Sequence, residues 1–151
     1  MKSILVLGVG NVLLSDEGAG VHVAQQLQKN ELPSDVEVID GGTGGYELIG
    51  FLSGRRKVII VDCLRAEEPP GTVIRATPED LDLGWPEPLS VHQSGLRELL
   101  YGAKSLIPLP HIIILGIVPE TVDTPGMSLS VTLQSRIDAI VSKVLEEAAS
   151  G

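Results

Sequence analysis

Apolar positions along this chain form two kinds of pattern that alternate with each other. Short apolar or alternating runs predict strands at 4–8, 36–40, 57–62, 72–75 and 111–117. Helices are predicted between them, several from apolar residues three or four positions apart, at 17–29, 46–52, 90–103 and 130–149. This alternation predicts an α/β fold, a three-layer α/β/α sandwich with a largely parallel central sheet, in one domain over residues 1–151.

The composition fits a sheet that helices cover on both faces. Only 3% of the residues are aromatic although 43% are hydrophobic, so the core has to be built from Val, Ile, Leu and Ala. No apolar run approaches the roughly 18 residues of a membrane-spanning helix, and we expect no signal peptide. One cysteine excludes an internal disulfide framework and suits a cytoplasmic protein. The net charge of −9 argues against nucleic acid and anionic membranes as partners.

Polar residues follow the predicted strands at the points where they end. Asp16 and Glu17 come after the first strand, Asp40 ends the second, Asp62 ends the third, and His92 opens a later helix. In open α/β sheets, ligands bind beyond the carboxyl ends of the strands. We therefore expect these side chains to meet at one edge of the sheet.

A dinucleotide-binding loop is one interpretation of this edge. Gly8 and Gly10 match the start of the glycine-rich fingerprint, and Asp40 lies where a ribose-binding acid would be. However, Leu13 replaces the third glycine, and Asp16 and Glu17 would compete with a pyrophosphate for the start of the helix. This interpretation is weaker than a metal site, and saturable NAD binding would support it.

A metal site is the second interpretation. Glu17, Asp62 and His92 provide two carboxylates and an imidazole from three loops, a mixed set that suits nickel or zinc. Spacing alone leaves open that the three are a helix cap, a strand-end acid and an ordinary helical histidine. We expect Cys63 to be a small core residue, and His22 to face solvent on its helix.

Five segments in order carry a further resemblance. They are GVGN…LLSDEGAG at 8–20, DGGTGG at 40–45, VD at 61–62, SVHQ at 90–93 and GIVPE at 116–120. Together they resemble the hydrogenase maturation endopeptidases, which remove the C-terminal tail from precursors of nickel–iron hydrogenase large subunits. The resemblance covers nearly the whole chain. Members of that family often carry alanine where this chain has Cys63.

The resemblance implies roles for particular residues. Glu17, Asp62 and His92 match the family's metal ligands, which would complete the coordination of nickel already inserted in the precursor. Another divalent metal could occupy these ligands in the isolated protein. The attacking water would be polarised by the metal or by a carboxylate such as Asp40, and the expected catalytic residues are Asp40, Glu17 and Asp62. Substrate recognition is implied for Gly41, Gly42, Thr43, Gly44 and Gly45.

The expected partner is the hydrogenase large-subunit precursor, and a small domain acting on so large a partner is expected to be a monomer. A non-catalytic chaperone that senses nickel but leaves the tail uncut is the remaining alternative.

Overall fold

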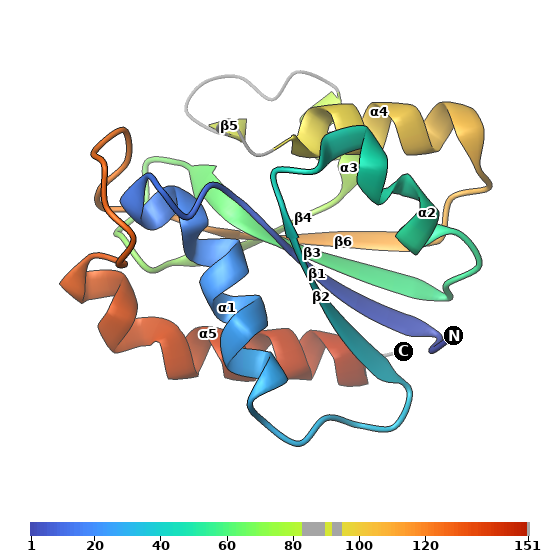
Figure 1. Ribbon diagram of the computed structural model, residues 1–151, viewed down its shortest axis with the longest axis horizontal. Helices are drawn as coiled ribbons and strands as arrows, with labels where there is room; N and C mark the ends of the chain where they lie inside the picture. The colour runs from blue at the N-terminus through green and yellow to red at the C-terminus, as the bar shows by residue number, and fades with distance from the viewer. Residues whose placement is uncertain (83–89, 92–94, 151) are drawn as a thin grey trace.

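A central sheet organises the residues that the structure, a computed structural model, describes: 1–82, 90–91 and 95–150 (Figure 1). Its six strands within these residues are β1 Ile4–Val9, β2 Val36–Gly42, β3 Lys57–Arg65, β4 Val73–Ala76, β5 Ser90–Val91 and β6 His111–Ile117. The order β2-β1-β3-β6-β4 is parallel except for β4, which runs antiparallel to β6 at one edge. The predicted, largely parallel sheet is therefore confirmed.

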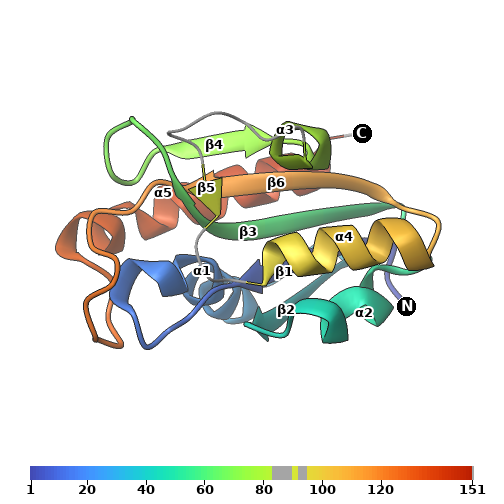
Figure 2. The same cartoon turned by 90° about the horizontal axis from the view of Figure 1, so that it is seen from above.

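Helices cover the sheet on both faces. The described α-helices are α1 Ala19–Gln28, α2 Ile49–Leu52, α3 Pro78–Asp82, α4 Leu96–Leu106 and α5 Val131–Ala149, and the 3₁₀ turns η1 Ser15–Gly18 and η2 Gly45–Leu48 precede α1 and α2. One layer holds α1 and α5, and the other holds α2, α3 and α4 (Figures 1 and 2). In the described part of the chain, no helix is both long and apolar enough to cross a membrane.

The apolar run of β3 shows why both faces must be covered. Ile59 and Val61 pack into the core beneath α1 and α5, whereas Val58 and Ile60 pack into the core beneath α2 and α4. Because successive side chains of a strand point to opposite faces, a strand between two helical layers has to be apolar at every position.

The predicted helix over 90–103 is wrong at its start. Ser90 and Val91 instead form β5, paired antiparallel with Arg65 and Leu64 at the end of β3. The helix α4 begins only at Leu96, because Gly95 has a φ of 82°, which lies outside the helical region. His92, which was expected to open this helix, lies outside the described residues.

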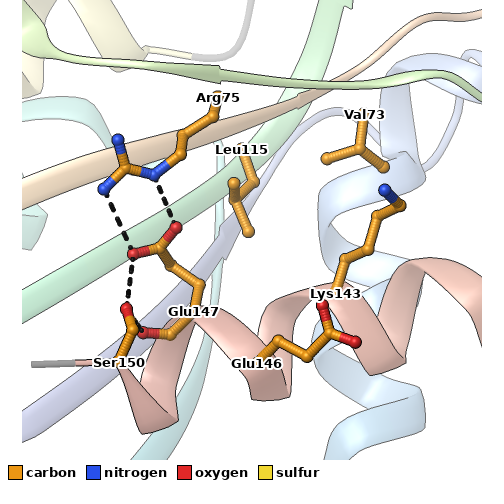
Figure 3. A pocket seen from close by; sticks show the side chains of 7 residues that line it. All are labelled: Val73, Arg75, Leu115, Lys143, Glu146, Glu147 and Ser150. Atoms are coloured by element: carbon orange, nitrogen blue, oxygen red, sulfur yellow. Dashed lines mark hydrogen bonds and ion pairs between the residues drawn. The ribbon is translucent and has the colours of Figure 1, made fainter.

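At the amino ends of the strands, a buried lysine holds the end of α5 against the sheet. The Lys57 Nζ donates to the Glu147 backbone oxygen and to Glu147 Oε2, both at 2.7 Å, and to the Ser150 backbone oxygen at 3.1 Å. Arg75 on β4 donates to the same Glu147 carboxylate at 2.7 Å (Figure 3). This hydrogen bond is the main reason that the pKa of Glu147 falls to about 2.

An open cavity of about 300 Å³ lies beside this ion pair (Figure 3). Its lining comes from β4, β6 and the end of α5: Val73, Arg75, Leu115, Lys143, Glu146, Glu147 and Ser150. None of the residues predicted to bind metal or substrate lines it. The cavity therefore does not bear on the site expected at the carboxyl edge.

Candidate functional site

The glycine-rich segment after β1 is folded tightly onto its own backbone. A Cβ placed on Gly10 would lie 2.2 Å from the Glu17 carbonyl oxygen, and the Asn11 N–H donates to that same oxygen at 3.1 Å. A Cβ on Gly20 would lie 2.1 Å from the Val61 carbonyl oxygen, so only glycine lets α1 pack this closely against β3. Close backbone packing therefore accounts for these glycines without a bound nucleotide.

Asp16 joins two loops that are far apart in the sequence. Its fully buried carboxylate accepts hydrogen bonds from the N–H groups of Glu120 and Thr121, both at 2.9 Å, and from the N–H and hydroxyl of Ser130, both at 2.8 Å. Ser130 is also the N-cap of α5 and accepts from the N–H of Leu133. Asp16 therefore fixes the position of η1, which carries the neighbouring Glu17, against the loop 119–130.

Glu17 and Asp62 lie together beneath this edge. Both are almost completely buried, at 1% exposure, and η1 packs against the end of β3. Their charges, with that of Asp16, all help to raise the pKa of the Cys63 thiol, although burial is the largest cause. Asp62 Oδ1 accepts from the Cys63 N–H at 2.7 Å. Two of the three predicted metal ligands are thus buried, on elements that pack against each other.

The third predicted ligand, His92, lies outside the described residues. Among residues 1–82, 90–91 and 95–150, no three His, Cys, Asp or Glu side chains are grouped as ligands of one metal ion. Two buried carboxylates fit the oxygen part of the predicted donor set. The three-ligand site therefore stays a prediction.

Asp40 is placed differently from the other two acids. It is exposed at the carboxyl end of β2, where it accepts from Gln25 Nε2 of α1 at 3.3 Å and from the Gly42 N–H at 3.1 Å. By strand alternation, Asp40 shares the α1 face with Val38, whereas Asp62 shares the α2 and α4 face with Ile60. The acids expected to converge do share one sheet edge, but Asp40 and Asp62 leave opposite faces of the sheet.

The glycine loop 41–45 contacts the start of α4. Gly42 and Gly45 have φ angles of 53° and 58°, which a side chain would strain. A Cβ on Gly95 would lie 3.0 Å from the Cα of Gly45 and 3.4 Å from the Thr43 carbonyl oxygen. This backbone contact sets the loop directly beside Gly95, at the start of α4.

The structure also tests what the sequence predicted for two side chains outside the site, Cys63 and His22. Cys63 is buried, as expected of a core residue, and its raised pKa makes it a poor nucleophile. His22 is only partly exposed, so the expectation that it faces solvent is wrong. Burial lowers its pKa, although a hydrogen bond with the Met127 backbone and the charge of Asp16 act in the opposite direction. A single helical histidine carries no pattern that would have shown its contact with a loop a hundred residues away.

Comparison with known proteins shows which family has this architecture. A family model described as HycI, hydrogenase maturation protease, matches residues 21–147. The chain belongs to the hydrogenase maturation protease family. The matched range contains the predicted site residues Asp40, Asp62 and His92, together with the loop 41–45.

Individual members of the hydrogenase maturation protease family resemble this chain over nearly its full length. Hydrogenase 2 maturation protease of Escherichia coli is 36% identical over 145 residues, which cover 94% of this chain and 88% of that protein. The hydrogenase expression/formation protein HupD of Thiocapsa roseopersicina is 35% identical, covering 95% of this chain and 66% of that protein. The structure of the hydrogenase maturating endopeptidase HybD from E. coli matches with a TM-score of 0.81 at 34% identity, over 99% of this chain and 94% of that one. The fold and the peptidase class implied by the five sequence segments are confirmed.

Proposed function

We propose that this protein is an endopeptidase that removes the C-terminal extension of a nickel–iron hydrogenase large-subunit precursor after nickel has been inserted. The observation that carries the proposal is the pairing of family membership with two carboxylates, Glu17 and Asp62, buried together at the carboxyl ends of β1 and β3. We further propose that it acts as a single-domain monomer in the cytoplasm.

The nickel in this proposal arrives as part of the substrate. Glu17, Asp62 and His92 would bind the nickel of the docked precursor through two carboxylates and one imidazole, a donor set that suits this ion. Binding a metal fixed in the substrate also fixes the peptide bond near it, which turns cleavage into a positioned, effectively intramolecular step. Since Asp16 is held by four donors, the turn that presents Glu17 is already in place before the precursor arrives.

Asp40 is proposed to accept the proton of the attacking water. An exposed carboxylate oriented by Gln25 and the Gly42 N–H suits a general base, because it is accessible and held in one orientation. Backbone N–H groups of the loop 41–45 would stabilise the oxyanion that forms. The Gly42 N–H already donates to Asp40, and the Gly44 N–H donates to the Gly41 carbonyl oxygen. The donors to the oxyanion would therefore be other N–H groups of the loop.

The direct test is to incubate the protein with nickel-loaded and nickel-free precursor and to measure the mass of the large subunit. We expect a shortened subunit only with the nickel-loaded form, and its loss in Glu17→Gln, Asp62→Asn and His92→Ala. Asp138→Asn is the matched control, since Asp138 is an exposed acid on α5. Normal processing by all three site variants would refute the metal-ligand roles. Binding without any cleavage would identify a nickel-sensing chaperone instead.

A further inference from the structure

The aromatic residues that the structure describes lie on the surface of the protein. The chain has one Trp, two Tyr and one Phe. Tyr46 is 58% exposed, Phe51 44% and Tyr101 70%. They belong to η2, α2 and α4, which pack against one another in the same helical layer (Figures 1 and 2). We call Tyr46, Phe51 and Tyr101 the aromatic face.

The tyrosine next to the substrate loop is seated by a glycine of α4. A Cβ on Gly102 would lie 2.8 Å from Tyr46 Cδ1 and 2.7 Å from Ile49 Cδ1. The absence of a side chain at Gly102 therefore lets the Tyr46 ring lie against α4 while more than half of the residue stays exposed. Tyr101 lies on the same helix, directly before Gly102 in the sequence. Aromatic side chains held in this way lose little conformational entropy when a partner covers them, which is why interfaces favour them.

The aromatic face is continuous with the loop proposed to bind substrate. Tyr46 follows Gly45 directly, and Gly45 in turn contacts Gly95 at the start of α4. The charged residues of η2, α2 and α4 balance, with Glu47 and Glu98 against Arg97 and Lys104, although the whole chain carries −9. A partner approaching this face meets little of the negative charge that the rest of the surface presents.

The size of the aromatic face favours one kind of occupant. With about 150–250 Å² available per aromatic side chain, the exposed parts of the three amount to roughly 350 Å². A stable interface takes about 800 Å² from each partner, so this face alone is too small to hold two copies of the chain together. Because Tyr46 directly follows Gly45, a substrate protein bound at the loop 41–45 can cover this face as part of a larger contact.

We propose that the aromatic face is a docking surface for folded, apolar surface of the hydrogenase large-subunit precursor, outside the segment that is cut. This inference rests on the proposed function for the identity of the partner. Tyr46 and Tyr101 select the precursor by binding, and they take no part in the chemistry at Glu17, Asp40 or Asp62. The expected signature is a change in the KM for precursor at constant kcat.

The test compares wild type with Tyr101→Ser, Tyr101→Phe and the control Leu109→Ser. Leu109 is also exposed and apolar but lies beside the start of β6, at the amino edge of the sheet. For Tyr101→Ser we expect KM for nickel-loaded precursor, and Kd measured by calorimetry, to rise about tenfold with kcat unchanged. Tyr101→Phe should restore most of the affinity, and Leu109→Ser should behave as wild type. Because Tyr101 is mostly in solvent, Tyr101→Ser is expected to fold normally, which circular dichroism checks.

Each result decides between the inference and its rivals. Unchanged KM and Kd in Tyr101→Ser overturns the docking surface while wild-type cleavage still supports the proposed function. Wild type that binds precursor without cutting it refutes the proposed function, and the Kd comparison then tests the docking surface independently. Wild type that neither binds nor cuts precursor overturns both. Sedimentation of wild type as a dimer that Tyr101→Ser dissociates overturns the inference, because the aromatic face would then contact a second copy.

Discussion

Replacing Asp16 tests whether one carboxylate holds the carboxyl edge of this protein together. Its four hydrogen bonds join η1 to residues more than a hundred positions later, at Glu120, Thr121 and Ser130. Asp16→Ala removes every one of these contacts. Asp16→Asn preserves shape and leaves one oxygen as an acceptor, but it turns an NH₂ group toward N–H and hydroxyl donors.

The size of the effect follows from these contacts. A hydrogen bond to a charged acceptor contributes about 1.5–3 kcal/mol, and the donors here are partly buried, so water can replace some of what is lost. We therefore expect Asp16→Ala to lower the free energy of unfolding by about 3–4 kcal/mol and Asp16→Asn to lower it by about 2 kcal/mol. Opening of the loop should also accelerate amide hydrogen exchange at Glu120, Thr121 and Ser130.

Urea unfolding followed by circular dichroism measures the first effect, and hydrogen exchange read by NMR measures the second. Asp138→Asn removes the same charge from an exposed position of α5 and should change stability by less than about 0.5 kcal/mol. If Asp16→Asn is as stable as this control and its loop amides exchange at the wild-type rate, the proposed fastening role of Asp16 is wrong.

Two further predictions concern packing and pH. Gly20→Ala should destabilise the protein by about 1–3 kcal/mol in urea unfolding, because its Cβ would overlap the Val61 carbonyl oxygen. The control Gly50→Ala should be neutral or slightly stabilising, because a Cβ at Gly50 has nothing within 4 Å. Equal stabilities of the two variants would refute the close packing of α1 against β3. Glu147 has a folded pKa of about 2, below the ordinary value of 4.5, so its contribution is present above pH 4.5 and is lost as the pH falls toward 2. Discounted for the solvent around exposed Arg75, this contribution is about 1 kcal/mol, and Glu147→Gln should flatten the stability profile measured by urea titrations across that range. A Glu147→Gln profile as steep as that of wild type would contradict this.

The sheet was predictable because its pattern is local. The apolar run at 58–61 requires burial on both faces, and the turn residues around each strand delimit it, so the parallel strands and the final helix were identified close to their observed bounds. The start of α4 was misjudged because the pairing of Ser90 and Val91 with β3 depends on residues some 25 positions earlier. Local periodicity does not record such a contact.

The placement of acids at the carboxyl edge was predictable from the strand ends, whereas their contacts were not. Strand ends placed Glu17 and Asp62 at one edge, and the structure puts both there, buried. The four donors to Asp16 come from residues 104 to 114 positions away, which no spacing rule connects with it. The face of the sheet from which Asp40 projects became clear only from the packing of Val38 beneath α1 and from the contact of Asp40 with Gln25.

The placement of Asp40 and Asp62 on opposite faces restricts how an extended peptide can lie on this protein. Because the strands are ordered β2-β1-β3, a peptide that reaches both acids must run across the tips of the strands, perpendicular to them. It would pass the loop 41–45 first, then the turn carrying Glu17, and then the end of β3. Under the proposed function, the stretch of precursor between the peptide bond cut at Asp40 and the nickel held at Asp62 would therefore have to span three neighbouring strand ends, roughly 10 Å or three to four extended residues.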